Sequence, residues 1–117
     1  MSLNKVILIG NVGKDPEIRY VSQDVAVATI VLATTNNAYT TKEGIQVPES
    51  SEWHTIKLWR NLAKTAEQYI RKGDKIYVEG QLRYTNYTDR SGLSRTKAEI
   101  WAEKLEIFNF HNVASEK

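Results

Sequence analysis

Hydrophobic and polar residues alternate along most of the chain, which is the period-2 pattern of β-strands with one buried face. Together with the turn signals between segments, this alternation predicts strands at residues 4–10, 25–35, 52–60, 73–87 and 95–102. Residues 17–21 resume an extended course after Asp15-Pro16. The polar stretch at residues 36–52 predicts a long loop, and long loops are commonly binding loops or mobile segments.

Residues 61–72 break the alternation and carry hydrophobic side chains at the spacing of one helix face. Asn61 is the predicted N-cap and Gly73 the predicted C′ residue. Five strands with one helix between the third and the fourth is the layout of the OB-fold, a small and partly open barrel. We therefore predict an all-β OB-fold over residues 1–110 and a frayed end at 111–117, with a sandwich or an SH3-like barrel as alternatives.

The strand predicted at residues 52–60, EWHTIKLWR, has an unusual distribution of side chains between its two sides. Ile56 and Leu58 point to one side, which is therefore the side that faces the core. The opposite side presents two large aromatic residues and a cation: Trp53, Lys57 and Trp59. Folding requires no such set on an outward face, so these residues are candidates for a binding function.

The strand predicted at residues 73–87 repeats this arrangement, with hydrophobic residues on one side and aromatic and basic residues on the other. The outward residues that matter are Lys75, Tyr77, Arg83 and Tyr87. A single nucleic-acid strand offers unstacked bases, each worth roughly 1–3 kcal/mol on an aromatic ring, and a negatively charged backbone. Aromatic residues interleaved with cations match both features. Packing alone would not require the cations.

Trp101 differs from the other tryptophans because acidic residues surround it. It shares its side of the last predicted strand with Lys97, Glu99 and Glu103. We therefore assign Trp101 to packing or to a subunit contact, ahead of nucleic-acid binding.

The charges are unevenly distributed, although the net charge of the 117 residues is only +2. From Trp53 to Lys97 the chain has ten basic and four acidic residues, a balance of +6, whereas the remainder has six basic and ten acidic residues, a balance of −4. A basic half that also carries the outward aromatics indicates a polyanionic partner. A content of 41% hydrophobic and 26% charged residues is typical of a globular domain.

Signals for membranes, secretion and catalysis are missing from the sequence. No apolar run approaches the roughly 18 residues of a membrane span, no leader is recognisable, and there is no cysteine, so we expect a cytoplasmic protein. The two histidines, His54 and His111, have no nucleophile or acid at a recognisable spacing. Metal-binding motifs and glycine-rich phosphate loops are absent. We therefore expect no enzymatic activity, no metal and no cofactor.

Four blocks of the sequence resemble the bacterial and mitochondrial single-stranded DNA-binding proteins. These blocks, in order, are NKVILIGNVGKDPEIRY (4–20), EWHTIKLW with a following LA (52–63), YIRKGDKIYVEGQLR (69–83) and YTDRSG (87–92). The resemblance runs from about Asn4 to Ile107. It implies an OB-fold that assembles as a homotetramer, wraps single-stranded DNA and serves replication, recombination and repair. It also implies a bacterial cytoplasmic protein associated with the nucleoid.

The resemblance also indicates which residues carry the binding function. The family's stacking aromatics fall on Trp53, Trp59, Tyr87 and Tyr39; the family usually has Phe and Trp where this chain has Trp59 and Tyr87. His54 matches a family histidine near the subunit interface. With the outward residues above, the stacking candidates are Trp53, Trp59, Tyr87, Tyr39 and Tyr77. The phosphate-binding candidates are Lys57, Arg83, Lys75, Arg71, Lys72, Lys5 and Arg19.

Two further expectations concern partners. The alternative function is an OB-fold module of primosome type that binds protein or structured RNA. Members of the family typically continue into a linker and an acidic tip that recruits repair and replication proteins. This chain ends at FNFHNVASEK, so we do not expect recruitment through such a tip.

Overall fold

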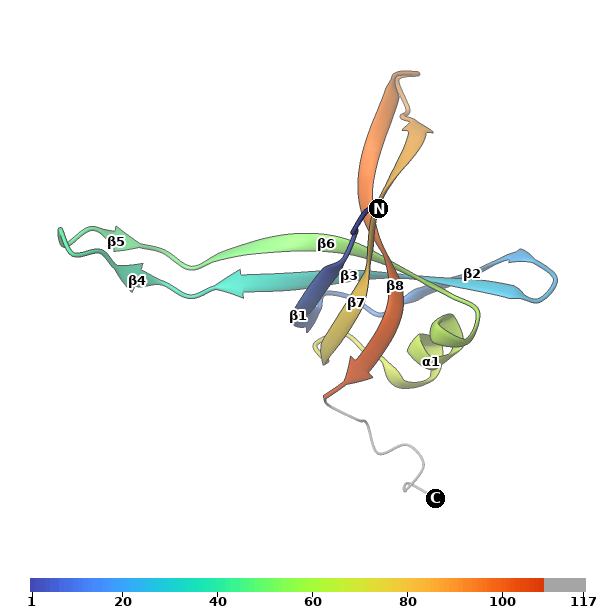
Figure 1. Ribbon diagram of the computed structural model, residues 1–117, viewed down its shortest axis with the longest axis horizontal. Coiled ribbons are helices and arrows are strands. Elements are labelled where there is room, and N and C mark those ends of the chain that lie inside the picture. The colour runs from blue at the N-terminus through green and yellow to red at the C-terminus, as the bar shows by residue number, and fades with distance from the viewer. Residues whose placement is uncertain (109–117) are drawn as a thin grey trace.

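The computed structural model describes residues 1–108, and within them the chain forms eight strands and one helix (Figure 1). The predicted β-rich architecture with a single helix is therefore confirmed. The part of the predicted domain after residue 108 and the predicted frayed end at 111–117 lie outside the described residues. The elements are β1 (Val6–Val12), β2 (Glu17–Ser22), β3 (Val25–Asn36), β4 (Tyr39–Thr40), β5 (Gln46–Val47), β6 (Ser50–Trp59), α1 (Asn61–Tyr69), β7 (Lys75–Thr88) and β8 (Ser94–Ile107).

Five of the strands form a closed ring. The order β1-β7-β8-β6-β3 is completed by a pairing of β3 with β1, and β2 adds to β3 as an antiparallel hairpin partner. The contact between β6 and β8 is short and parallel, with Ile56 opposite Ile100 and Lys57 opposite Trp101. With α1 between β6 and β7, this is the predicted OB-fold.

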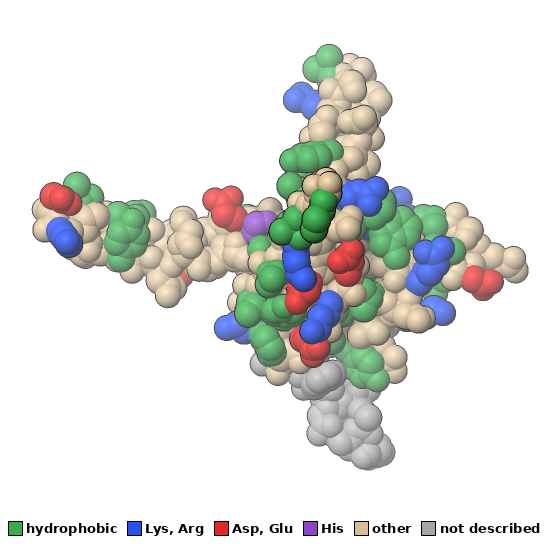
Figure 2. Space-filling model, in the orientation of Figure 1, with side chains coloured by type: hydrophobic (Ala, Val, Ile, Leu, Met, Phe, Trp, Pro, Cys, Tyr) green, Lys and Arg blue, Asp and Glu red, His purple; other side chains and the backbone are tan. Residues whose placement is uncertain are grey.

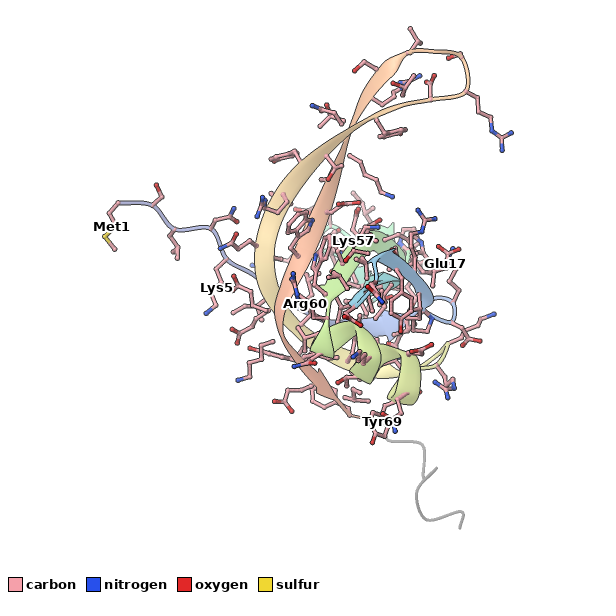
Figure 3. The ribbon with its side chains drawn as sticks, turned by 90° about the vertical axis from the view of Figure 1, so that its right-hand side faces the viewer. Met1, Lys5, Glu17, Lys57, Arg60 and Tyr69 are labelled. Carbon is pink, nitrogen blue, oxygen red and sulfur yellow. The ribbon has the colours of Figure 1, made fainter. Side chains whose placement is uncertain are left out.

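The core fills the ring from alternate positions of each strand. Its largest fully buried side chains include Ile30 and Leu32 of β3, Ile56 and Leu58 of β6 and Ile76 of β7. The helix α1 covers one end of the ring and lies between the labelled Arg60 and Tyr69 in Figure 3, and its Ala63 and Ala66 are buried. Burial of one such aliphatic side chain contributes about 1.5–3 kcal/mol. The buried side chains therefore determine which side of each strand faces the core, as predicted.

The prediction of a loop at residues 36–52 is wrong. β3 extends to Asn36, β6 begins at Ser50, and β4 pairs with β5 between them, so paired strands divide the segment and it forms a β-ribbon. A turn with Gly44 at φ +89° closes the ribbon. Figure 1 shows this ribbon projecting from the ring as an arm. Because the arm has no core to cover, both of its sides are mostly exposed and the period-2 signal is lost.

The first strand also ends later than the predicted residue 10. Asn11 and Val12 belong to β1, where they pair with Ala33 and Leu32 of β3. The helix begins without the predicted cap, because Arg60, at φ +56°, precedes it and makes no side-chain capping bond. It ends at Tyr69, and Gly73 takes φ +94° in the following turn, after the C′ position.

The last strand is longer than predicted, and its pairing with β7 is irregular at one point. β8 reaches Ile107, and its pairing with β7 shifts where Glu79 lies opposite Lys104 and Gly80 opposite Ala102. The remaining residue, Glu103, is therefore the extra residue of a β-bulge. A Cβ atom at Gly80 would lie 2.2 Å from the Trp101 carbonyl oxygen, so only glycine allows the two strands to approach this closely.

Candidate nucleic-acid interface

The outward side chains of β6, which we call the β6 face, are Trp53, Thr55, Lys57 and Trp59. Trp53 is 62% exposed and Trp59 is half-buried, whereas the alternate residues Ile56 and Leu58 are fully buried. The structure therefore places both tryptophans on the side predicted from the sequence. The Trp53 ring lies against Gly13, where an added Cβ atom would come within 2.5 Å of it.

Trp101 joins the β6 face at its Trp59 end. The centroids of the Trp59 and Trp101 rings are 5.2 Å apart with an interplanar angle of 50°. The guanidinium carbon of Arg83 lies 4.2 Å from the centroid of the Trp101 ring, a cation–π arrangement. Trp101 thus packs as expected, and the residue it packs on is Trp59, a candidate stacking residue of the same chain.

A buried carboxylate anchors this group of side chains. Glu99 is 6% exposed, and its Oε1 accepts hydrogen bonds from Thr85 Oγ1 at 2.9 Å and Trp101 Nε1 at 3.3 Å. The other oxygen of Glu99 lies 4.0 Å from Lys57 Nζ, which donates to Thr29 Oγ1 at 2.8 Å. Lys57, a predicted phosphate-binding residue, is therefore partly engaged by an acid that the sequence analysis did not assign to the site.

A cavity of about 650 Å³ opens beside these residues. Its walls come from β2, β3, β6, β7 and β8, and Lys57 and Glu17, labelled in Figure 3, are among them. Arg19, the predicted phosphate-binding residue of β2, also lines the cavity, as does Lys97 of β8. The cavity therefore combines indole surface with three cations and two acids: Arg19, Lys57, Lys97, Glu17 and Glu99.

The other two stacking candidates of the family pattern lie on projecting hairpins. Tyr39 is 60% exposed on the arm, and Tyr87 is 48% exposed on the β7–β8 hairpin opposite Arg95. The turn of that hairpin is held by Asp89, whose carboxylate accepts from Arg95 Nε at 2.8 Å. This bond, with further donors from Ser91 and the Leu93 backbone, lowers the pKa of Asp89 to about 2. The turn that presents Tyr87 is thus well ordered by its own hydrogen bonds.

Tyr77 and Lys5 lie away from the β6 face. The Tyr77 hydroxyl donates to Glu79, which forms an ion pair with Lys5 at 3.2 Å. The Tyr77 hydrogen bond and the Lys5 charge lower the pKa of Glu79, and the same bond raises the pKa of Tyr77. In Figure 3, β7 and β8 run between Lys5 on one side and Lys57 on the other.

The surface around Tyr77 is balanced in charge. Figure 2 shows acidic and basic side chains alternating over β7 and β8, with hydrophobic side chains beside them over β1. Tyr77 lies four residues before Gln81, the β7 partner of Trp101, which is about 13 Å along the strand. Lys75, two residues before Tyr77, belongs to the same end of β7. The structure therefore does not gather Tyr77, Lys75 and Lys5 with the tryptophans.

Arg71 and Lys72 follow the end of α1 and form hydrogen bonds within the chain. The Arg71 guanidinium donates to the carbonyl oxygens of Glu67, Gln68 and Ile70 at 3.2, 3.4 and 2.9 Å. These are carbonyls that a helix C-terminus otherwise leaves unpaired, so the side chain acts as a cap. The Lys72 backbone N–H donates to Asp15 at 2.8 Å. The predicted phosphate-binding role of Arg71 thus competes with an intramolecular one.

His54 is half-buried at the point where the arm leaves the ring. Its Nε2 lies 2.9 Å from Thr34 Oγ1, in agreement with a hydrogen-bonded histidine. Its role at a subunit interface stays a prediction. Among residues 1–108, no cluster of histidine and acidic side chains could hold a metal ion, and no helix is long and apolar enough to cross a membrane.

A comparison with known protein families identifies the family of this chain. Residues 3–108 match the Single-strand binding protein family over nearly the whole chain. The chain belongs to this family. Among its relatives, the single-stranded DNA-binding protein of Bacteroides thetaiotaomicron is 48% identical over 109 residues, which are 93% of this chain and 68% of that protein. The single-stranded DNA-binding protein of Neisseria meningitidis serogroup A is 40% identical over 112 residues, 96% of this chain and 63% of that protein.

A solved structure of the family has the same fold. It is described as a Plasmodium falciparum SSB complex with ssDNA, with a TM-score of 0.81 and 28% sequence identity, covering 93% of this chain and 97% of that one. The resemblance to single-stranded DNA-binding proteins and the OB-fold prediction are therefore confirmed. The chain spans about two thirds of the length of its two bacterial relatives, 68% and 63%.

Two residues that contact the candidate binding residues, Trp101 and Glu99, were not assigned to binding from the sequence. The decisive contact is the parallel pairing of Lys57 with Trp101, which joins strands far apart in the chain. Periodicity reports which side of a strand a residue occupies, but not which other strand lies next to it. The acidic neighbours of Trp101 were correctly noted, although Glu99 turned out to be a buried partner of the indole.

Proposed function

We propose that this protein binds single-stranded DNA without sequence preference and protects it during DNA replication, recombination and repair, as a binding protein and not as an enzyme. The observation that carries the proposal is the β6 face, where Trp53 and Trp59 flank Lys57 on a strand whose other side buries Ile56 and Leu58. The complex of the Plasmodium relative with ssDNA supports the same partner.

The spacing of the tryptophans suits a strand of nucleic acid. Trp53 and Trp59 are six residues apart on one strand, which corresponds to about 20 Å. This separation accommodates several nucleotides lying along the face and is too long for two contacts to one base. Stacking on an indole depends little on base identity, so the arrangement favours binding without sequence readout.

The cations nearest the tryptophans are the best placed for phosphate groups. Lys57 lies between the two indoles, Arg83 lies over Trp101, and Arg19 lines the adjacent cavity. Lys97, which was not among the predicted residues, lines the same cavity. Lys75, Lys72, Arg71 and Lys5 are proposed only as peripheral contacts, because each lies away from the indoles or has an intramolecular role.

Titration with oligo-dT tests the proposal. We expect quenching of tryptophan fluorescence at low salt, with a binding constant that falls as salt rises. If the four cations near the indoles each neutralise one phosphate, log K should fall against log salt with a slope of about −3, since each contact on a single strand contributes about −0.7. Absence of any quenching at low salt would disprove DNA stacking. Equal competition by duplex DNA or transfer RNA would favour the alternative module instead.

We further propose that the chain assembles as a homotetramer through surfaces that include β1 and the region of His54. Ile7 and Ile9 are 54% and 49% exposed on β1, beside the charge-balanced surface of Tyr77, and such a face suits a second copy of the chain. A cytoplasmic, nucleoid-associated location in a bacterium is part of the same proposal, since the relatives include bacterial proteins.

Light scattering measures the assembly directly. We expect a mass of four times the 13.4 kDa chain at micromolar concentration. An Ile9→Lys variant should lower this mass, because it would bring four uncompensated cations into the proposed contact. A 13.4 kDa particle for the unaltered chain would contradict the tetramer and leave DNA binding to be judged by the titration.

A further inference from the structure

We propose that Trp101 is a positioning residue that joins Trp59 and Arg83 into one site for a base and a neighbouring phosphate of single-stranded DNA. The inference rests on the proposed function and assigns a role to a residue that the sequence analysis left to packing. It follows from three features: the contact of Trp101 with Trp59, the hydrogen bond of Trp101 to the buried Glu99, and the position of the Arg83 guanidinium over the Trp101 ring.

The Trp101 ring packs against one side of the Trp59 ring at a tilt of 50°. The Trp101 ring lies 5.2 Å from the Trp59 ring, and Trp59 Nε1 is buried without a hydrogen-bond partner among residues 1–108. Trp59 is half-buried and lines the cavity of about 650 Å³. A side chain fixed in this way loses little conformational freedom when a base stacks on it, so binding costs less than with a freely rotating indole.

The anchor fixes Trp101 in turn. Its Nε1 donates to the buried Glu99, which also accepts from Thr85 Oγ1 at 2.9 Å. The backbone register places Trp101 between Lys57 of β6 and Gln81 of β7. Since three strands and a buried carboxylate determine its position, Trp101 is a rigid support for the groups that rest on it.

The Arg83 guanidinium lies over the Trp101 ring. Its guanidinium carbon lies 4.2 Å from the Trp101 centroid, and no hydrogen bond or ion pair to another described residue engages the side chain. A guanidinium that stacks on an indole can still direct its N–H groups at a phosphate in a bidentate manner. The same indole therefore orients a stacking ring and a phosphate-binding fork next to each other.

A role in packing alone makes a different prediction. If Trp101 only filled space beside Trp59, its removal would affect stability and stacking, but it would not change the number of phosphates that the protein neutralises. The dependence of binding on salt reports that number, so it distinguishes the two roles.

The test compares Trp101→Ala, Trp101→Phe and Arg83→Ala in oligo-dT titrations over a series of salt concentrations. We expect Trp101→Ala to weaken binding about tenfold at low salt and to reduce the slope of log K against log salt by about 0.7, the value for one phosphate. Arg83→Ala should reduce the slope equally, and the double variant should reduce it no further. Trp101→Phe retains a ring for Arg83 and should keep the slope of the unaltered protein.

Trp53→Ala is the matched control. Trp53 is a tryptophan of the same β6 face, but it lies at the end of that face away from Trp101, on which Arg83 stacks. It should weaken binding without changing the slope. Thermal unfolding of each variant shows whether it is folded. If Trp101→Ala does not fold, Arg83→Lys tests the contact from its other partner, since lysine retains the charge without the planar fork that stacks on the indole and should reduce affinity nearly as much as alanine.

Each result decides the matter. An unchanged slope in Trp101→Ala, with or without a loss of affinity, would overturn the inference, as would an Arg83→Lys variant that binds like the unaltered protein. Both results leave the proposed function intact, because the unaltered protein still binds. Failure of the unaltered protein to bind oligo-dT would instead reject the proposed function together with the inference.

Discussion

Replacing Trp53 and Trp59 together by alanine is expected to weaken the binding of oligo-dT by about 2–6 kcal/mol, the sum of two stacked bases at roughly 1–3 kcal/mol each. The two sites lie about 20 Å apart on β6, so their contributions should be nearly additive. Trp53 is 62% exposed, and its loss should leave the fold unaffected. Fluorescence anisotropy of labelled oligo-dT at low salt measures the loss for each single variant and for the pair.

The matched control for this experiment is Tyr84→Ala. Tyr84 is 69% exposed on β7, but it occupies the side of that strand opposite to Tyr87 and Arg83 and does not line the cavity. Its removal should change binding by less than the removal of either tryptophan. Equal losses for Tyr84 and for Trp53 would show that exposed aromatics bind DNA indiscriminately. The β6 face would then not be the binding surface.

The facing of β6 could be predicted because each residue of that strand has one unambiguous side. Ile56 and Leu58 are apolar and lie two residues apart, so the core had to be on their side and Trp53 had to face outward. The same reasoning succeeded for Ile76 and Val78 of β7. A strand with one buried face therefore shows a clear hydrophobic alternation in the sequence. The order of such strands and the helix then predicts the OB-fold.

Features that depend on neighbouring strands could not be predicted in this way. The arm at residues 36–52 has no buried face, so its pairing leaves no hydrophobic pattern. The contact between Trp59 and Trp101 arises from the short parallel pairing of β6 with β8, and the bulge at Glu103 shifts the register within β8. Positions in a closed ring are set by which strands meet, and periodicity within one strand does not contain that information.

The hydrogen bonds of Arg71 illustrate the same limit for charged residues. Basic residues near the end of a predicted helix are equally compatible with a phosphate contact and with capping of the last carbonyls. In the structure the guanidinium donates to three carbonyls of the helix end, which leaves less of it for DNA. Charge counting identified the basic half of the chain, but only the geometry separates Arg83, which rests on an indole, from Arg71.

The second large effect is expected for Leu58→Ala, on the opposite side of the same strand. Leu58 is fully buried beside Ile30 and Ile56 in the core, and truncation of such a leucine costs about 2–5 kcal/mol through lost burial and the remaining cavity. Urea unfolding of the variant should therefore show a lower midpoint with an unchanged dependence on urea. Binding of oligo-dT at a temperature where the variant is folded should remain close to that of the unaltered protein.

Trp53→Ala should give the reverse result, with weaker binding and nearly unchanged stability, because its side chain is mostly exposed. The pair thus separates the two sides of β6 by two independent measurements. If Trp53→Ala lowered the urea midpoint as much as Leu58→Ala, Trp53 would be part of the core and the β6 face would not be a free surface. If Leu58→Ala abolished binding while folded, the core side of β6 would determine the DNA contact through the position of the strand.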